Sequence, residues 1–276
     1  MSRFTNQTAL ITGGTGGLGE SHVRTYHAEG ANVVIGSTAE SLGRATRLAA
    51  ELGERALAVH LDVAREDDWT TAVAAAEHTF GTLTILVNNA GIQNAATTIE
   101  STDRARWDRT FAINVTGQYL GIKAVTPAMR RAGGGVIVNI GSTMAYGGTA
   151  RYASYVASKW AVRGLTMSAA LELGRDNIRV NVIHPGVVST NLIHEPAAPG
   201  ERPISDFYDP GPFAIPRLGD PADVSAALLY LTGRVVRDRD RTGTRRRPAA
   251  GSRPPDRRGL TTNITQWPRS AWFISW

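Results

Sequence analysis

The chain has 276 residues, a formal net charge of +6 and no cysteine. The lack of cysteine excludes disulfide bonds, thiolate catalysis and zinc sites built from thiolates. We expect one α/β domain with an appendage, because α/β units of about 200 to 250 residues are common. The first residues hold no apolar signal core and no uncharged run is long enough to span a bilayer, so we predict a cytoplasmic protein with no membrane partner.

The positive charge is concentrated in one part of the chain. Residues 234–276 contain eleven arginines, no lysine and three aspartates, so this tail carries +8 and residues 1–233 carry −2. The first 233 residues therefore give no electrostatic reason to expect nucleic-acid binding.

Apolar runs and helical patterns alternate along the first 233 residues. This alternation is typical of a doubly wound parallel sheet with helices on both faces, the Rossmann-type three-layer αβα fold. We predict a single domain of this class. The predicted strands cover 8–12, 31–36, 56–63, 83–87 and 136–140, and the predicted helices run from about 19 to 30, 39–52, 67–80, 103–131, from 152 onward and 220–231.

A glycine-rich segment follows the first predicted strand. Gly13, Gly14, Gly16, Gly17 and Gly19 stand between that strand and a helix. Glycines at such a junction let the backbone turn tightly, let a pyrophosphate approach and aim free N–H groups at it. The position after the first strand indicates a dinucleotide-binding loop.

Polar residues appear at two further places. Asn88-Asn89-Ala90-Gly91 ends the fourth predicted strand, at the edge where parallel sheets bind ligands. Asn114 lies inside the predicted helix 103–131, where asparagine does not favour the helix. Its side chain is therefore either solvated or used, and the spacing alone favours solvation.

Tyr155 and Lys159 stand four residues apart in a predicted helix, so they share one face. An adjacent ammonium stabilises a phenolate, and we expect Lys159 to lower the pKa of Tyr155 from its usual value of about 10. Ser142 follows an apolar strand and is expected to bring its hydroxyl to the same cleft. Taken alone, Tyr-x-x-x-Lys also occurs in helices where tyrosine is half-buried and lysine is extended toward water.

Six motifs together, in order and spacing, resemble those of the short-chain dehydrogenase/reductase family, in its conventional-length branch. They are Thr12-Gly13-x-x-x-Gly17-x-Gly19, Asn88-Asn89-Ala90-Gly91, Asn114, Ser142, Tyr155-x-x-x-Lys159 and Pro185-Gly186-x-x-x-Thr190. The resemblance covers residues 1 to about 233. The stretch from Tyr155 to Gly186 also looks like bacterial members that act on hydroxysteroids and other secondary alcohols.

The resemblance implies an NAD(P) site. Gly13, Gly17 and Gly19 would lie beneath the pyrophosphate, and Asp62 and Val63 would border the adenine. Thr190 would anchor the carboxamide, and Asn89 to Gly91 would brace the sheet. The full implied set of cofactor-binding residues is Gly13, Gly17, Leu18, Gly19, Ser37, Asp62, Val63, Asn89, Gly91, Tyr155, Lys159, Pro185, Gly186 and Thr190.

The resemblance also implies a mechanism that interconverts a secondary alcohol and a ketone. Tyr155 would act as acid and base, and Lys159 would hold the nicotinamide ribose. Ser142 would bond the substrate oxygen and Asn114 would position a water in a proton relay. No metal is required, so His184 and His194 are expected to be structural.

The end of the second predicted strand bears on the choice between NAD and NADP. Family members that use NAD usually carry an aspartate there, and this chain has Ser37 and Thr38 instead. We favour NADP, because hydroxyls can bond a phosphate and no charge repels it. Arg44 or Arg47 could assist from a distance.

Residues 187–217 are irregular and proline-rich, as expected of a lid over the substrate. Phe207, Tyr208, Phe213 and Ile215 either form the surface for a bulky hydrophobic alcohol or ketone or attach the lid to the core.

The family pattern ends near Gly233, and we expect the tail 234–276 to be disordered or loosely packed. A shifted reading frame explains it: one back-translation of residues 239–248, read from its second base, encodes Gly-Thr-Glu-Leu-Val-Leu-Asp-Gly-Gly, which resembles the family's last strand. The alternative is a functional basic segment that binds nucleic acid or an acidic partner. The three tryptophans in 267–276 could form an apolar patch.

Three functions follow. The favoured one is an NAD(P)-dependent oxidoreductase of secondary alcohols or ketones. The alternatives are a catalytically impaired nucleotide-binding domain without its last strand, and a 3-oxoacyl thioester reductase. Family members are commonly dimers or tetramers, but the altered terminus removes part of the usual contact surface.

Overall fold

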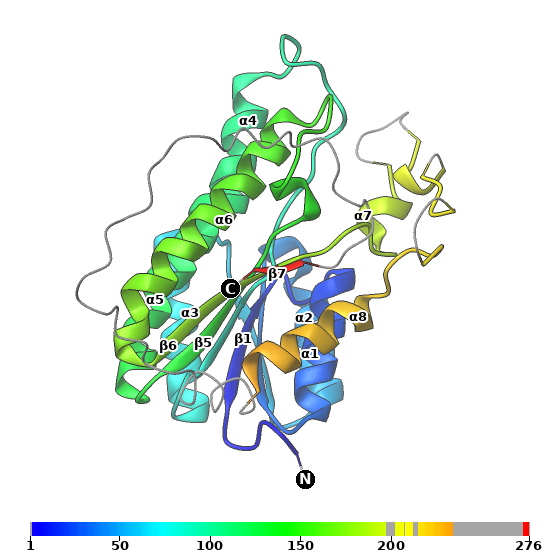
Figure 1. The fold of residues 1–276 in the computed structure, drawn as a ribbon. Coiled ribbons are helices and arrows are strands. Elements are labelled where there is room, and N and C mark those ends of the chain that lie inside the picture. The colour runs from blue at the N-terminus through cyan, green and yellow to red at the C-terminus, as the bar shows by residue number, and fades with distance from the viewer. Residues whose placement is uncertain (1, 197–201, 207, 212–214, 234–272, 276) are drawn as a thin grey trace, which may run out of the picture.

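A computed structural model describes residues 2–196, 202–206, 208–211, 215–233 and 273–275. These residues form one sheet with the strand order β3-β2-β1-β4-β5-β6-β7, in which β1 to β6 are parallel (Figure 1). The predicted fold class is confirmed. The strands are β1 Thr8–Thr12, β2 Asn32–Ser37, β3 Ala56–His60, β4 Ile85–Asn88, β5 Gly135–Ile140, β6 Ile178–His184 and β7 Phe273–Ser275.

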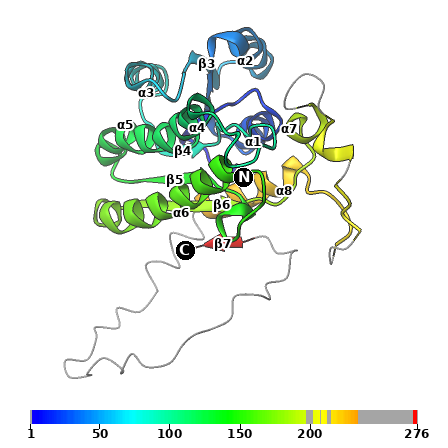
Figure 2. The same ribbon diagram turned by 90° about the horizontal axis from the view of Figure 1, so that it is seen from above.

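Helices cover both faces of the sheet (Figure 2). Helices α1, α2 and α8 pack on one face, and α3, α5 and α6 pack on the other. The helices are α1 Gly17–Ala28, α2 Ala39–Leu52, α3 Glu66–Phe80, α4 Arg104–Phe111, α5 Gly117–Arg131, α6 Ala153–Leu173, α7 Asn191–His194 and α8 Pro221–Thr232.

The central strands β1, β2, β4 and β5 are mostly apolar because both faces of the sheet are covered. In β1, Ile11 joins the core beneath α1, α2 and α8, whereas Leu10 points to the core beneath α3, α5 and α6. Successive side chains of a strand point to opposite faces, so a strand buried on both sides is a continuous apolar run rather than an alternating one. This is the pattern that the sequence shows.

The order of the strands reverses between β1 and β4. Strand β1 lies between β2 and β4, so the chain runs outward in one direction from β1 to β3 and in the other from β4 to β6. Parallel sheets of this kind form a crevice at the carboxyl ends of the strands where the order reverses. The glycine-rich segment after β1 and Asn89 after β4 both lie at this edge.

The predicted helix 103–131 contains a π-helical turn. Helix α4 ends at Phe111, a π-helical turn covers Ala112–Thr116, and α5 begins at Gly117. The helical backbone runs from Arg104 to Arg131, so the predicted extent is confirmed, but the π-helical turn within it was not predicted. Asn114 lies in the π-helical turn and is fully buried, so the expectation of a solvated side chain is wrong. Single π-helical turns occur frequently at functional sites.

The end of the tail adds a strand that the sequence did not predict. Residues 273–275 pair antiparallel with Val182–His184 of β6, at the edge of the sheet. The rest of the tail, 234–272 and 276, lies outside the described residues, so the frame-shift hypothesis remains a prediction. Within the described part of the chain, no helix combines the length and apolar character needed to cross a membrane.

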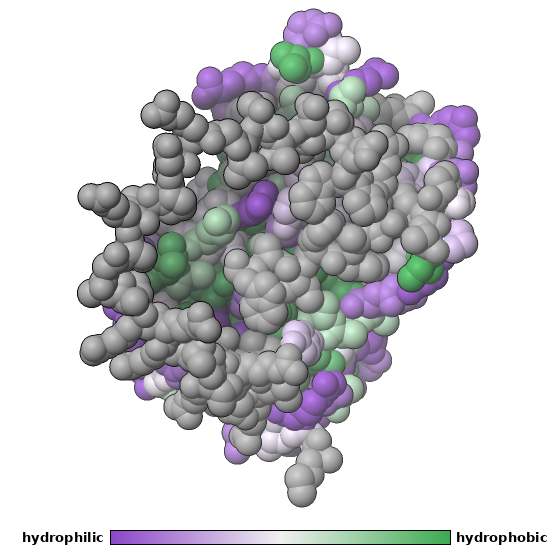
Figure 3. Space-filling model, in the orientation of Figure 1, coloured by the Kyte–Doolittle hydropathy of each residue, from purple (hydrophilic) through white to green (hydrophobic). Residues whose placement is uncertain are grey.

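Helix α6 also carries apolar residues on its outer side. Trp160, Met167 and Leu171 are exposed, and their spacing of seven and four residues places them along one side of the helix. Hydrophobic residues, drawn green, are visible on the left of the face shown in Figure 3, where Figure 1 places α6.

Candidate active site

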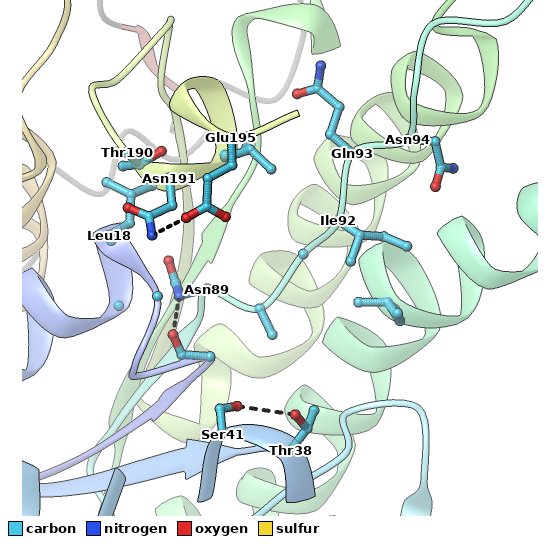
Figure 4. Close-up of a pocket in the computed structure, with 18 of the residues that line it drawn as sticks. Leu18, Thr38, Ser41, Asn89, Ile92, Gln93, Asn94, Thr190, Asn191 and Glu195 are labelled. Atoms are coloured by element: carbon cyan, nitrogen blue, oxygen red, sulfur yellow. Dashed lines mark hydrogen bonds between the residues drawn. The ribbon is translucent and has the colours of Figure 1, made fainter. Parts of the chain in front are cut away.

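A cavity of about 1040 Å³ opens at the carboxyl ends of β1, β2 and β4. Its wall is formed by the loop after β1, the start of α2, the loops after β3 and β4, and the lid around α7 (Figure 4). The predicted site residues on this wall are Gly13, Gly17, Leu18, Gly19, Ser37, Asp62, Val63, Asn89, Gly91 and Thr190.

The loop after β1 depends on glycine at specific positions. Gly13 adopts φ +62°, a conformation that L side chains rarely adopt, and a Cβ there would lie 3.1 Å from the Cα of Ala90. A Cβ on Gly19 would overlap the carbonyl oxygen of Gly13. A Cβ on Gly17 would lie 2.9 Å from the Thr190 Cβ. The loop therefore keeps a bare backbone on the cavity wall and packs closely against the next loops.

Thr12 and Asn89 fix this loop to the end of β4. The amide of Asn89 donates to the carbonyl oxygens of Thr12 at 2.9 Å and Gly13 at 3.2 Å. The hydroxyl of Thr12 accepts hydrogen bonds from the backbone N–H groups of Asn89 and Ala90, at 3.0 and 2.9 Å. The bracing predicted for Asn89 is thus present, and Thr12, a buried residue at the end of a strand, is its partner.

A group of hydroxyls lies at the end of β2. Ser37 donates to Ser41 at 2.9 Å, and its own oxygen lies 3.4 Å from that of Thr15 in the glycine-rich loop. The hydroxyl of Thr38 is 3.2 Å from that of Ser41 (Figure 4). Arg44 also lines the cavity, whereas Arg47 is not part of its wall. The sequence did not show which of the two arginines would reach the cofactor. The structure shows that Arg44 is the one at the cavity.

Two charged residues beside these hydroxyls were not singled out from the sequence. Glu40 and Arg109 both line the cavity. The pKa of Glu40 is lowered, chiefly by a hydrogen bond with Thr38, and the charge of Arg109 acts in the same direction. Arg109 belongs to α4, whereas Glu40 belongs to α2. No local motif could have predicted that these two segments, far apart in the sequence, both line the cavity.

Asp62 and Val63 follow β3 and are held by α3. The backbone N–H of Asp62 donates to Asp68, and the Asp62 carboxylate accepts from the N–H of Ala64. The indole N–H of the buried Trp69 donates to the carbonyl oxygen of Val63 at 2.9 Å. These bonds fix the loop that forms one wall of the cavity.

Asn114 connects the loop after β4 to α6. Its amide oxygen accepts from the N–H of Ile92 at 2.8 Å, and its amide nitrogen donates to the carbonyl of Ile92 at 2.9 Å and to the hydroxyl of Ser158 at 3.1 Å. Gly91, on the cavity wall, leaves room for it: a Cβ there would lie 3.3 Å from Asn114 Oδ1 and 3.7 Å from Lys159 Nζ. Gly91 thus separates the cavity from a polar cluster behind it.

That cluster contains the remaining predicted catalytic residues. Lys159 is buried and donates to the carbonyl oxygen of Ile140 at 3.0 Å, and its ammonium lies 5.3 Å from the centroid of the Tyr155 ring. The Ser142 hydroxyl interacts with the Tyr155 phenol. Asn114, Ser142, Tyr155 and Lys159 are therefore neighbours, although they do not form the cavity wall itself. Pro185 and Gly186 are not on the wall either, and Pro185 accepts from the N–H of Thr143.

The expected lowering of the Tyr155 pKa is wrong for this structure. Desolvation raises the pKa of Tyr155 to about 12, and the hydrogen bond with Ser142 opposes this only in part. Burial lowers the pKa of Lys159 to about 8. The ammonium lies over the ring face and donates to the carbonyl of Ile140. The cost of burying the phenolate and the ammonium is therefore larger than the attraction between them.

The segment predicted to be a lid contributes Leu192, Ile204 and Glu195 to the cavity wall. Glu195 accepts a hydrogen bond from the amide of Asn191 at 2.9 Å (Figure 4). Of the four apolar residues that the sequence suggested, Tyr208 and Ile215 are not on this wall, while Phe207 and Phe213 lie outside the described residues. His194 contacts the Ser189 hydroxyl at 2.8 Å.

Comparisons with known proteins agree with this arrangement. Residues 7–199 match the family model described as short chain dehydrogenase. A 3-alpha-(or 20-beta)-hydroxysteroid dehydrogenase of Mycobacterium tuberculosis is 45% identical over 231 residues, with 83% of each chain covered. A cyclopentanol dehydrogenase of Comamonas testosteroni is 38% identical over 234 residues, which cover 84% of this chain and 91% of that protein.

A third relative and a solved structure extend the comparison. A trans-4-hydroxycyclohexanecarboxylate dehydrogenase of Sinomonas cyclohexanicum is 47% identical over 197 residues, covering 69% of this chain and 75% of that protein. The crystal structure of a 3-ketoacyl-(acyl-carrier-protein) reductase from Brucella melitensis, complexed with NADH, superposes with a TM-score of 0.75 at 33% identity and covers 83% of this chain and 91% of that chain.

Proposed function

Because this chain belongs to the short-chain dehydrogenase family, whose members use NAD(P), we propose that it interconverts a cyclic secondary alcohol and its ketone. The observation that carries the proposal is the adjacency of two features: the glycine-lined cavity, and the cluster of Asn114, Ser142, Tyr155 and Lys159 directly behind Gly91. The first suits a dinucleotide and the second suits proton transfer to a substrate oxygen.

The residues on the cavity wall fit the cofactor. Gly13, Gly17 and Gly19 leave the backbone bare at the N-terminus of α1, where N–H groups and the helix dipole favour a pyrophosphate. Asp62 and Val63 would border the adenine, and Thr190 would hold the carboxamide. When bound, the nicotinamide ring would deliver a hydride to the carbonyl carbon or accept one from the alcohol carbon.

Tyr155 would give its phenolic proton to the ketone oxygen during reduction and remove it from the alcohol during oxidation. Since its pKa is about 12, the phenol is protonated at neutral pH and ready to act as the acid. The Ser142 oxygen accepts from the N–H of Met144 at 3.2 Å, and its hydroxyl bonds the Tyr155 phenol. The hydroxyl hydrogen of Ser142 would turn from that phenol to a bound substrate oxygen.

Lys159 would contribute a positive charge beside the developing phenolate and hydrogen bonds to the ribose. Asn114 would hold the loop after β4 at the cavity edge and position the water of a proton relay, as the family resemblance implies. The double hydrogen bond of Asn114 with Ile92 supports the first of these roles.

We favour NADP over NAD at the adenosine end. Ser37, Thr38 and Ser41 supply hydroxyls, and Arg44 supplies a cation on the same wall. No carboxylate occupies the end of β2, although Glu40 lies in the next turn. A 2′-phosphate would therefore meet donors rather than a repelling charge at Ser37.

The names of the relatives support cyclic alcohols as the substrate class. Two named substrates are alicyclic and a third is a steroid, whereas the 3-ketoacyl reductase favours a thioester substrate. A panel of cyclopentanol, cyclohexanol, hydroxysteroids and a 3-oxoacyl thioester with its alcohol, each assayed with both cofactors at the nicotinamide absorbance band, tests the proposal. Turnover of cyclic alcohols or ketones is expected. Cofactor binding without turnover of any compound would support the catalytically impaired domain instead.

The dimer or tetramer expected from the family is likewise a prediction, for which the apolar side of α6 is one available surface.

A further inference from the structure

His184 is the last residue of β6 and has no role in the site described so far. It is completely buried, yet it lies against Ser142 rather than among apolar side chains alone. Its Nδ1 is 2.9 Å from the carbonyl oxygen of Ser142 and 3.3 Å from the backbone nitrogen of the same residue. A carbonyl needs a donor, so the shorter contact places the imidazole proton on Nδ1.

The structure around His184 is built to hold the ring in this position. A Cβ on Gly141 would overlap Nδ1 of the ring, so the glycine before Ser142 permits the close approach. On the other side, Tyr146 contacts the imidazole edge to face, with ring centroids 4.9 Å apart. The Arg163 guanidinium in turn lies 4.4 Å from the centroid of the Tyr146 ring.

The imidazole stays neutral in this environment. Burial is the main cause that lowers the pKa of His184 to about 4, and the charges of Arg163 and Lys159 act in the same direction. A neutral ring with its proton on Nδ1 has a single donor, and that donor points at Ser142. Within the described residues, Nε2 is buried and has no hydrogen-bond partner.

Ser142 needs such support because it does not belong to a regular element. It follows the end of β5 with φ −167° and caps a short helical turn at Thr143–Ala145. Backbone bonds hold the peptides around it: the N–H groups of Gly141 and Thr143 donate to Ile183 and Pro185, and the Ser142 carbonyl accepts from the N–H of Ala145 at 2.9 Å. His184 adds a side-chain donor to the same carbonyl. Rotation of this one peptide would move the hydroxyl away from Tyr155.

We propose that His184 is a positioning residue for catalysis, which holds the Ser142 hydroxyl at the substrate oxygen through its bond to the Ser142 carbonyl. The proposal rests on the proposed function, since it assigns Ser142 a place in the reaction. A histidine that only filled the core would affect stability alone. A positioning role instead requires that the effect of His184 on catalysis depend on the Ser142 side chain.

The test is a double-mutant cycle. His184→Leu keeps most of the volume without the donor, and His184→Asn keeps an amide N–H near the position of Nδ1. We expect His184→Leu to lower kcat about tenfold to a hundredfold, the range that follows a misplacement of about 1 Å, while the dissociation constant of the cofactor stays within about twofold. His184→Asn should restore most of kcat. In the Ser142→Ala background, His184→Leu should have little further effect on kcat.

His22 provides a matched control. It belongs to α1 and is also fully buried, and its Nδ1 contacts the hydroxyl of Ser225 on α8 at 2.7 Å. His22→Leu should change the unfolding midpoint by an amount similar to His184→Leu without the loss in kcat. An equal loss of kcat in His184→Leu with and without Ser142, or no advantage of His184→Asn over His184→Leu, would overturn the proposal.

A crystal structure of His184→Leu distinguishes this inference from the proposed function. We expect the Ser142 oxygen to be displaced by about 1 Å or more, and to return in His184→Asn. An unmoved Ser142 in His184→Leu refutes the positioning role even if the enzyme is active. Absence of turnover in the unmodified chain refutes the proposed function and leaves this structural outcome measurable. If His184→Leu does not fold, kcat and the position of Ser142 are compared between His184→Asn and His184→Gln. A loss of kcat is expected only in the variant whose amide does not reach the Ser142 carbonyl.

Discussion

The ammonium nitrogen of Lys159 lies 5.3 Å from the centroid of the Tyr155 ring, one helical turn further along α6. The two side chains share one face, as the spacing of four residues predicts. Lys159 is nevertheless bonded to Ile140 on β5 and not to the phenol oxygen. The helix therefore places the two side chains on one face, and strand β5 fixes the position of the ammonium.

Removing the phenolic oxygen of Tyr155 should abolish most of the turnover. We expect Tyr155→Phe to lower kcat by about a hundredfold to ten-thousandfold, the usual contribution of a positioned acid and base, with cofactor binding retained. Initial rates at the nicotinamide band and a fluorescence titration of the cofactor measure the two effects. Tyr119→Phe, a change at an exposed tyrosine of α5, serves as the control. Equal rates for Tyr155→Phe and the unmodified chain would contradict the assigned role.

The pH dependence of ketone reduction should follow Lys159. Tyr155 stays protonated up to a pKa of about 12 and does not limit the acid form, whereas Lys159 loses its charge as the pH rises through its pKa of about 8. We therefore expect kcat/KM for reduction to be flat below about pH 8 and to fall above it, because this parameter reports ionisation in the free enzyme.

Lys159→Arg tests whether Lys159 causes the fall in kcat/KM above about pH 8, because a guanidinium keeps its charge at that pH. The residual kcat/KM of Lys159→Arg should stay level to at least pH 10. If the descending limb remains near pH 8 in this variant, another group is responsible for it.

The choice of cofactor should depend on Arg44 and not on Arg47. Both are exposed residues of α2, but only Arg44 lines the cavity. Arg44→Ala should lower kcat/KM for NADP about tenfold, since a charge-assisted bond to the phosphate is lost, and should leave NAD within about twofold. Arg47→Ala should change neither value.

Ser37→Asp should reverse the preference. A carboxylate at the end of β2 repels a 2′-phosphate and can bond the ribose hydroxyls of NAD. We expect kcat/KM for NADP to fall by about a hundredfold and that for NAD to rise. An unmodified chain that already prefers NAD would show that the hydroxyl group at this position does not select NADP.

Gly121 should be indispensable to the packing of α5. A Cβ there would lie 2.6 Å from the Asn88 side chain and 2.6 Å from the buried Trp69 ring. We expect Gly121→Ala to lower the free energy of unfolding by about 1–3 kcal/mol through overpacking, measured by urea denaturation.

Gly164 is the matched control on α6, since it is exposed and a Cβ there would meet no atom within 4 Å. Gly164→Ala should raise the free energy of unfolding by about 0.5–1 kcal/mol, because alanine favours the helix and restricts the unfolded chain. A stabilising Gly121→Ala would show that Trp69 can move aside at no cost.

The local pattern of residues was sufficient for strands β1 to β5 and the main helices, but not for β6 and β7, and it placed ten of the predicted cofactor-binding residues on the cavity wall. Strand and helix alternate because each strand of a parallel sheet must be covered on both faces. The sequence shows this requirement as short apolar runs, such as Ala9-Leu10-Ile11 in β1. Glycines at Gly13 and Gly19 could be assigned to the ligand edge because the turn after β1 tolerates no side chain there.

Contacts between distant segments decided the rest. The π-helical turn at Asn114, the selection of Arg44 over Arg47 and the contact of His184 with Ser142 each depend on where separate elements meet. The ionisation of Tyr155 changed even in direction, because the spacing of tyrosine and lysine determines which face they share but not how much water is excluded around them. Sequence spacing thus determined which groups this protein brings together, and the tertiary structure alone decided their burial and partners, since desolvation is a property of the whole packed environment.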